Sequence, residues 1–129
     1  DRRKEKDVLE RAYDDAAGVT ARFNQNLFRR IDHELGGSFG RAAFRHIAVY
    51  DEVVGRIEMH LESLADQTVR IEALELDVAF TKGERIHTED SYKYSDAEIE
   101  ELARASGLRV MSRYTDAKGQ FLSVMFAPT

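Results

Sequence analysis

Hydrophobic residues recur at every fourth position from Val19 to Leu35, which is the spacing of one face of an α-helix. The members of this stripe are Val19, Phe23, Leu27, Ile31 and Leu35. Gly36 follows where a left-handed residue commonly ends a helix. The preceding segment KEKDVLERAYDD, residues 4–15, has helical composition without glycine or proline. A short helix followed by a long one is therefore predicted.

The pattern changes to alternation after Phe44, as expected of strands with one buried face. In RIEMHLES, residues 56–63, three apolar residues alternate with polar ones. In TVRIEALELDVAF, residues 68–80, the alternation slips by one position near Glu72, so a bulge or a tight bend is predicted there. A turn at Gly83 leads into a further strand. The strands are expected to form an antiparallel meander.

The last of these strands, GERIHTEDSYKY at residues 83–94, has one face that is wholly polar when residues are counted alternately. The residues on that face are Arg85, His87, Glu89, Ser91 and Lys93. Half-exposed antiparallel strands commonly look like this, so a solvated face and a binding face both fit the pattern.

A third helix is predicted from Ser95, because Ser95 and Glu98 form a capping box ahead of an apolar run. Gly107 follows where that helix should end. The segments LRVMSRYTD, residues 108–116, and QFLSVMFA, residues 120–127, then read as strand, turn and strand. The whole pattern predicts an α+β fold with N-terminal helices, an antiparallel meander, one helix and a terminal strand pair.

Composition narrows the class of protein. With 129 residues and 43% hydrophobic content, the chain suits one domain or a piece of one. The net charge of −5, with acids and bases interspersed, argues against a nucleic-acid partner. No apolar run is long enough to cross a membrane, and no signal peptide is evident, so a soluble cytoplasmic protein is expected. The first methionine is Met59, inside a predicted strand, so we expect the chain to be a fragment of a longer protein.

Three features suggest chemistry that the sequence does not favour. The four histidines are His33, His46, His60 and His87, and no two have ligand spacing, so a metal site is not predicted. The glycine-rich segment 36–40 follows a helix, which favours capping over a phosphate cradle. The acids Asp14 and Asp15 precede a helix, where such residues usually stabilise the helix end.

Four separated motifs together resemble the C-terminal part of the histidine-specific, S-adenosylmethionine-dependent methyltransferases of ergothioneine biosynthesis. The motifs are RAYDDAAGVTARFNQNLFRRIDHELGG, RIEMHLES, GERIHTEDSYKY and RYTDAKGQFLSV. The similarity runs from about Val8 to Val124, in the family's order and spacing.

This resemblance implies an α/β Rossmann-like methyltransferase that carries an inserted substrate-binding lobe. Residues 1–6 would end a connection from the methyltransferase half, residues 7–94 would be the lobe, and residues 95–129 would return to the methyltransferase fold. The S-adenosylmethionine site is expected in a missing N-terminal half, so this piece alone is expected to be inactive. The intact enzyme would methylate the α-amino group of L-histidine three times, to the trimethyl betaine.

The family's substrate-binding residues carry over to Tyr13, Thr20, Met59, Glu89 and Ser91, with no catalytic or metal-binding residue in this part. Glu89 and Ser91 stand two apart on a strand, about 6.6 Å along the backbone, so both would reach one imidazole. A carboxylate accepts from a ring N–H, and a hydroxyl donates or accepts at the other nitrogen. Met59 would pack on the ring, and Tyr13 would hold the backbone end of the amino acid.

Two rival functions remain: a non-enzymatic amino-acid-binding module, and a methyltransferase acting on tryptophan derivatives. Glu89 beside Met59 favours imidazole over indole. The terminal strand pair is also expected to leave unpaired edges and apolar faces around Val110, Phe121 and Met125. Such edges recruit other strands, so self-association of this piece is predicted.

Overall fold

The computed structural model describes residues 1–129, and its first elements are two helices. Helix α1 spans Lys6–Tyr13 and helix α2 spans Val19–Leu35. Gly36 closes α2 in the left-handed conformation, with a φ of 65°, and its N–H donates to the Ile31 carbonyl. The predicted helix pair and its glycine cap are confirmed.

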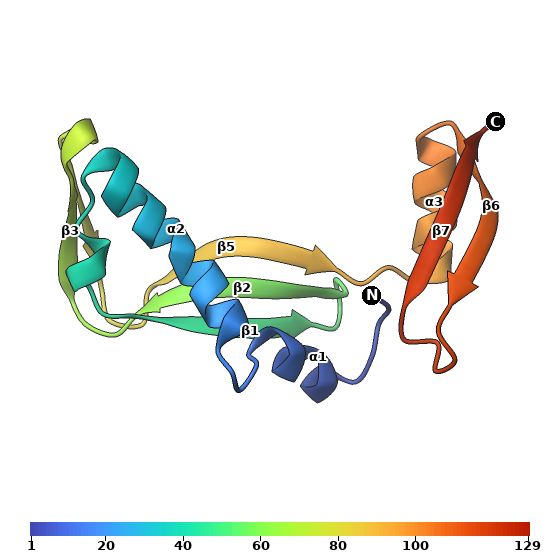
Figure 1. Cartoon of the computed structure of the whole chain (residues 1–129), viewed down its shortest axis with the longest axis horizontal. Helices are drawn as coiled ribbons and strands as arrows, with labels where there is room; N and C mark the ends of the chain where they lie inside the picture. Colours follow the sequence, from blue (N-terminus) through green and yellow to red (C-terminus); the bar gives the residue numbers. More distant parts are fainter.

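The three longest strands of the first part of the chain form one antiparallel sheet in the order β1-β2-β5 (Figure 1). Their bounds are Phe44–Asp51 for β1, Arg56–Ser63 for β2 and Arg85–Tyr92 for β5. Strands β3 (Gln67–Ile71) and β4 (Leu76–Phe80) form a separate two-stranded hairpin. The prediction of a continuous meander was therefore wrong, because a hairpin interrupts the sheet between β2 and β5.

The slip in the hydrophobic pattern near Glu72 is the tip of that hairpin. A 3₁₀ turn over Glu72–Leu74 joins β3 to β4, and Glu75 adopts a left-handed φ of 50°. The predicted tight bend is confirmed, and it separates two strands instead of bulging one.

Helices α1 and α2 pack on one face of the sheet, which we call the inner face, and bury two apolar clusters there. One cluster joins α2 to β2 and the β3–β4 hairpin, and its members are Phe28, Phe39, Leu61, Val69, Ile71 and Phe80. The other joins α1 to β1 and β2, and its members are Leu9, Tyr50, Ile57 and Met59. The alternation predicted for residues 56–63 thus puts its apolar positions on the inner face.

The apolar stripe of α2 is only partly buried. Ile31 and Leu35 pack against the first cluster, but Phe23 is 65% exposed. Asn24 and Phe28 point inward in its place, with exposures of 4% and 7%. The stripe identified the helix correctly and its buried face incorrectly over the first two turns.

A register shift divides the polar face that was predicted for residues 83–94. Met59 pairs with Glu89, whereas the next residue of β2, His60, pairs with His87, so Thr88 is an extra residue. Glu89 and Ser91 consequently lie on the inner face, because their register partners on β2 are inner-face residues. His87 lies on the opposite, outer face of the sheet beside His60.

Arg85 also lies on the outer face, where it forms an ion pair. Its Nε donates to the buried Glu62 carboxylate at 2.8 Å, and Arg45 donates to the other carboxylate oxygen at 2.6 Å. These bonds, led by the one from Arg85, lower the pKa of Glu62. The prediction of a single polar face over residues 83–94 was wrong, because alternate counting does not reveal a bulge.

The last elements form a C-terminal unit, residues 95–129. Helix α3 (Asp96–Ala105) begins with the predicted Ser95–Glu98 capping box, in which both reciprocal hydrogen bonds are present. Strands β6 (Leu108–Thr115) and β7 (Leu122–Pro128) form the predicted antiparallel pair. This unit stands at the far end of β5, apart from the rest (Figure 1).

Two arginines of the N-terminal segment bridge to this unit. Arg2 pairs with Asp96 at 2.9 Å, and Arg3 pairs with Glu98 at 2.7 Å. The Arg3 guanidinium also lies on Gly55, a left-handed residue with a φ of 76°, so closely that a Cβ there would collide with it. The two parts are therefore connected by ion pairs, and the Arg3 side chain requires a glycine at position 55.

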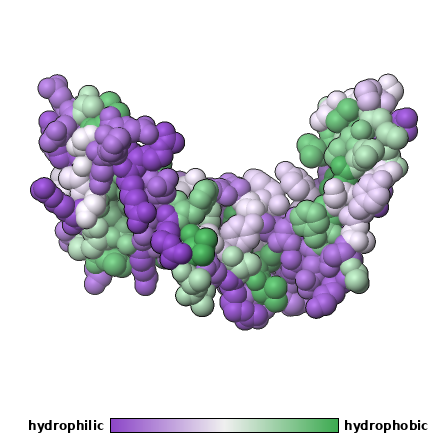
Figure 2. Space-filling view, in the orientation of Figure 1, coloured by the Kyte–Doolittle hydropathy of each residue, from purple (hydrophilic) through white to green (hydrophobic).

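Apolar side chains gather on the C-terminal unit, which forms one arm of a U-shaped molecule (Figure 2). Its exposed large apolar residues are Leu102, Met111, Tyr114, Phe121, Met125 and Phe126, while Val110 is half-buried. No helix in the structure combines the length and the apolar character needed to span a membrane.

Candidate functional site

Tyr13 and Ser91, two of the five predicted site residues, are brought into direct contact. Tyr13 is the last residue of α1 and Ser91 lies near the end of β5, and their hydroxyl oxygens are 2.8 Å apart. Both side chains are half-buried on the inner face of the sheet. The structure therefore joins the AYDD and TEDSYKY motifs at one point.

Lys93 is the third member of this cluster. It is 2% exposed, and its Nζ donates to the Tyr13 hydroxyl and to Ser91 Oγ, each at 2.7 Å. Of the two readings that the polar pattern allowed, a solvated face does not hold for Lys93, because α1 covers this end of β5 and supplies an oxygen. The sequence did contain a signal for this position. Lys93 is two residues after Ser91, as Ser91 is two residues after Glu89, so all three lie on the same strand face.

The Lys93 ammonium alters the chemistry of the Tyr13 phenol. Burial of Tyr13 raises its pKa, but the hydrogen bonds with Lys93 and Ser91 act more strongly together, so its pKa lies below the ordinary value of 10.0. The ammonium also lies 4.6 Å from the centre of the Tyr13 ring, within the range of a cation–π contact. Tyr13 is thus a better hydrogen-bond donor than an isolated tyrosine.

A second network fixes the backbone at the end of α1. His46 Nε2 lies 2.8 Å from the Tyr13 carbonyl oxygen, so this nitrogen carries the proton and donates it. His46 Nδ1 then accepts from Asn24 Nδ2 at 3.0 Å, and the same amide donates to the His60 carbonyl at 3.1 Å. The buried Asn24 therefore holds His46, and His46 holds Tyr13.

Met59 and Glu89 lie opposite each other on β2 and β5. Met59 is 2% exposed and packs with Leu9, Tyr50 and Ile57 in the cluster beneath α1. Glu89 is exposed and lines a hollow of about 280 Å³ between α2 and β5. These two predicted residues are neighbours in the sheet, one in the core and one at its accessible edge.

Thr20 stands apart from this group and serves the start of α2. Its backbone N–H donates to Asp15 Oδ1 at 2.8 Å, and the Val19 N–H donates to the other carboxylate oxygen at 2.9 Å. These bonds, with the Thr20 N–H first, lower the pKa of Asp15 to about 2. The prediction that an acid stabilises this helix end is confirmed for Asp15.

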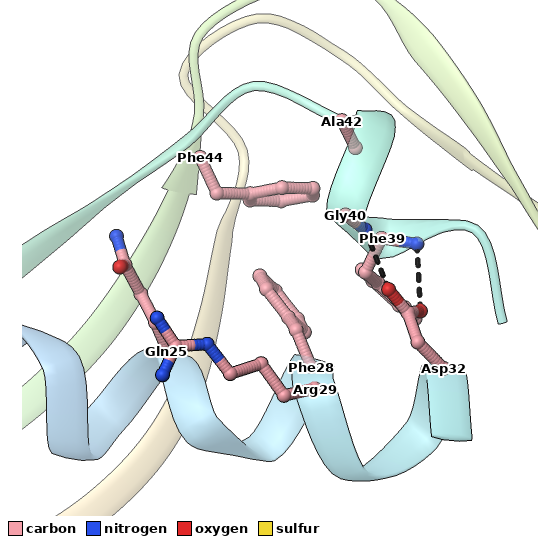
Figure 3. A pocket seen from close by; sticks show the side chains of 8 residues that line it. All are labelled: Gln25, Phe28, Arg29, Asp32, Phe39, Gly40, Ala42 and Phe44. Carbon is pink, nitrogen blue, oxygen red and sulfur yellow. Dashed lines mark hydrogen bonds between the residues drawn. The ribbon is translucent and has the colours of Figure 1, made fainter. Parts of the chain in front are cut away.

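A separate aromatic hollow of about 180 Å³ lies at the other end of α2 and contains none of the predicted residues (Figure 3). Asp32 lies at its edge and accepts the N–H groups of Phe39 and Gly40 at 2.8 and 2.6 Å (Figure 3). The chain's own carboxylate thus occupies the Phe39 and Gly40 donors of the segment 36–40. Gly36 caps α2, as predicted for this segment.

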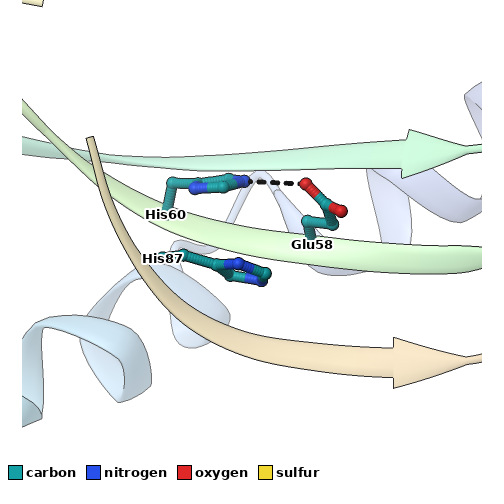
Figure 4. A group of neighbouring side chains, drawn as sticks. All are labelled: Glu58, His60 and His87. Atoms are coloured by element: carbon teal, nitrogen blue, oxygen red, sulfur yellow. Dashed lines mark hydrogen bonds and ion pairs between the residues drawn. The ribbon is translucent and has the colours of Figure 1, made fainter. Parts of the chain in front are cut away.

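The outer face carries the one group of three side chains with metal-ligand atoms, Glu58, His60 and His87 (Figure 4). Sequence spacing gave no sign of it, because the β2–β5 pairing brings the two histidines together, with ring centres 4.7 Å apart. Their ligand atoms lie within 4.8 Å of one another. However, Arg56 donates to Glu58 at 2.5 Å, and a guanidinium this close opposes a second cation.

The inner-face group has the features of a small-molecule site, with accessible polar groups at the edge of an apolar core. Glu89 offers a carboxylate that accepts hydrogen bonds, and the Tyr13–Ser91–Lys93 cluster offers hydroxyl groups beside a positive charge. The arrangement is suited to binding and orienting a polar ligand.

Comparison with known proteins identifies the family. A family model described as histidine-specific, S-adenosylmethionine-dependent methyltransferase matches residues 1–128. The chain is 46% identical to a histidine N-alpha-methyltransferase of Mycolicibacterium smegmatis and 42% identical to that of Mycobacterium tuberculosis, in each case over 88% of this chain and 35% of the relative. It is 30% identical to an L-tryptophan methyltransferase of Psilocybe serbica, over 94% of this chain and 34% of that protein.

The chain therefore spans about a third of the length of the curated relatives it matches. The family match, by contrast, covers nearly every residue. The resemblance carried by the four motifs is confirmed: the chain belongs to the family of histidine-specific, S-adenosylmethionine-dependent methyltransferases.

Proposed function

We propose that this chain is the substrate-recognising part of an enzyme that transfers methyl groups from S-adenosylmethionine to the α-amino group of L-histidine, as far as the trimethyl betaine. Within it, Glu89 and Ser91 would read the imidazole, Met59 would support the ring from the core, and Tyr13 would hold the backbone end. Thr20 would contribute from the start of α2. The observation that carries the proposal is the convergence of Tyr13, Ser91 and Glu89 on the inner face, in a chain of this family.

The close approach of Tyr13 and Ser91 suits a small amino acid. Histidine places its ring one methylene from the α-carbon, so a hydroxyl that reads the ring and one that holds the backbone must be near neighbours. The 2.8 Å between the two oxygens meets that requirement. Orientation is the work expected of this part, because the amine lone pair must face the methyl group along the line of displacement.

The glycine-rich segment 36–40 is a poor candidate for the S-adenosylmethionine site, because it follows a helix and its Phe39 and Gly40 N–H groups already donate to Asp32. We propose that the cofactor is held by a Rossmann-like half that precedes this chain, and that residues 1–6 connect to it. Residues 7–94 would be the inserted lobe, and residues 95–129 would complete the Rossmann-like sheet.

The proposal is tested by assaying the full-length enzyme for histidine-dependent conversion of S-adenosylmethionine to S-adenosylhomocysteine. Mass spectrometry of the product should show methylation of histidine, ending at the trimethylated form. L-tryptophan is the competing substrate to compare, because one relative is named an L-tryptophan methyltransferase. A higher kcat/KM for tryptophan than for histidine would reject the proposal, and binding of histidine without turnover would identify a module that is not an enzyme.

A further inference from the structure

The buried Lys93 ammonium fixes which hydrogen bonds its two neighbouring hydroxyls can offer to a ligand. It donates to both oxygens at 2.7 Å, and those oxygens are bonded to each other at 2.8 Å. Two hydroxyls possess two protons and four acceptor lone pairs in total. The bond between them uses one proton and one lone pair, and Lys93 uses two further lone pairs.

One O–H and one lone pair therefore remain for a ligand. Without Lys93, three lone pairs would remain, and the pair would accept more readily than it donates. With the ammonium present, the pair of Tyr13 and Ser91 is no longer mainly an acceptor. Its remaining O–H group needs a hydrogen-bond acceptor on the ligand. Its positive charge, close to both oxygens, further disfavours a donor on the ligand.

The choice between the two hydroxyls follows from their acidity. A phenol is a stronger donor than an alcohol, and Lys93 strengthens it, as the lowered pKa of Tyr13 indicates. Tyr13 therefore donates to Ser91. Ser91, which accepts from both Tyr13 and Lys93, is left with its own proton to donate elsewhere.

We propose that Lys93 makes Ser91 a hydrogen-bond donor to the substrate ring, so that the site selects a ring with a lone-pair nitrogen toward Ser91 and an N–H toward Glu89. This rests on the function proposed above. Neutral imidazole has one nitrogen of each kind. Pyrrole and indole have an N–H and no lone-pair nitrogen, and imidazolium has two N–H groups.

Lys93 would accordingly be a positioning residue that acts through Ser91, without touching the substrate. A ring that lacks the lone-pair nitrogen leaves the Ser91 proton without a partner, which should lower affinity by roughly ten-fold. Glu89 alone would not discriminate in this way, because a carboxylate accepts from any ring N–H. The specificity for histidine over indole substrates would thus depend on both ends of the site.

The test compares L-histidine with the two regioisomers of pyrrolylalanine, which keep the five-membered ring and one N–H but lack the lone-pair nitrogen. In the full-length enzyme, the ratio of kcat/KM for histidine to that for pyrrolylalanine should fall by roughly ten-fold on Lys93→Met. Lys93→Met keeps the apolar stem and removes the ammonium. The exposed Lys82→Met is the matched control and should leave the ratio unchanged.

A purely structural role for Lys93 would lower kcat/KM for all three substrates in parallel and keep the ratio constant, which would overturn the proposal. If Lys93→Met does not fold, Ser91→Ala provides the same test, because it removes the donor itself and should also lower the ratio. In a Ser91→Ala background, Lys93→Met should change the ratio no further. If the unmodified enzyme does not methylate histidine, the proposed function fails; if it does and the ratio is unmoved, only the role of Lys93 fails.

Discussion

Met59 on β2 and Glu89 on β5 are register partners, and the ladder between these strands shifts by one residue immediately beyond them. The shift places Thr88 outside the pairing, where its hydroxyl donates to the Met59 carbonyl at 2.9 Å. Glu89 and Asp90 are consequently adjacent acids on opposite faces of one sheet. This pair permits a sharp test of the proposed site.

Glu89→Gln in the full-length enzyme should lower kcat/KM for histidine by roughly ten-fold or more. The substitution keeps the size of the side chain and removes the charge that accepts the ring N–H, and a loss of about 1.4 kcal/mol corresponds to ten-fold. Asp90→Asn is the matched control, because Asp90 faces Arg56 at 3.1 Å on the outer face. Equal effects of the two substitutions in steady-state kinetics would contradict the assignment of faces.

Tyr13→Phe should weaken the binding of histidine more than that of imidazolepropionate, which has the ring and the carboxylate but no amine. The reason is that Tyr13 is proposed to hold the backbone end of the substrate, and a phenol that donates to Ser91 keeps only a lone pair, which accepts from the amine. Titration calorimetry of the full-length enzyme with both ligands measures the difference. A parallel loss for histidine and imidazolepropionate would assign Tyr13 to the ring alone or to the structure.

Asn24→Leu should destabilise the chain by about 1 to 3 kcal/mol, because it leaves the buried His60 carbonyl and His46 Nδ1 without their donor. Urea unfolding of the 129-residue chain measures the change. Asn26→Leu, at an exposed position of the same helix, is the control and should have little effect. An unchanged unfolding midpoint for Asn24→Leu would show that the hydrogen bonds from Asn24 through His46 to the Tyr13 carbonyl do not stabilise the fold.

Asp15→Ala should lower stability at neutral pH and have no effect in strong acid. The pKa of Asp15 is lowered from 3.8 to about 2 in the folded chain, so its stabilising bonds are present above the unfolded value and are lost as pH falls through about 2. Thermal midpoints of the two proteins should therefore converge between pH 4 and pH 2. Asp14→Ala is the control, since the Asp14 side chain makes no bond at this helix end, and a difference that persists below pH 2 would reject this role for Asp15.

The isolated chain should self-associate through the β6–β7 pair, whose outer edges are unpaired and whose apolar side chains include Phe121 and Met125, at 56% and 50% exposure. Light scattering should show a mass that rises with protein concentration. Met125→Glu should shift the chain toward the monomer. Val53→Glu, at a 92% exposed position on the β1–β2 turn, should not; a monomer at high concentration would refute the prediction.

The features that sequence could predict are those decided within a few residues. The Gly36 cap and the Ser95–Glu98 capping box depend on local backbone geometry, and the alternation around Met59 depends on one strand having one buried face. Each of these appears in the structure as the pattern predicts.

The features that sequence missed depend on a distant partner. The bulge at Thr88 exists only in relation to the register of β2, so counting along one strand could not find it. Lys93 is buried because α1 returns with the Tyr13 hydroxyl, and His60 meets His87 only through strand pairing. The site residues were found by family resemblance, whereas the division of the polar residues 85–93 between two faces required the fold.

One side chain, Arg3, contacts three separate parts of the molecule. Its Nε donates to the Lys93 carbonyl at 3.0 Å, its other end holds Glu98 on α3, and its guanidinium rests on Gly55. Exposed ion pairs such as the one between Arg3 and Glu98 weaken as salt screens them. Lys93 belongs to both groups of contacts, because its carbonyl accepts from Arg3 while its ammonium donates to Tyr13 and Ser91. One residue therefore links the connection to the C-terminal unit with the hydroxyls that are proposed to read the substrate.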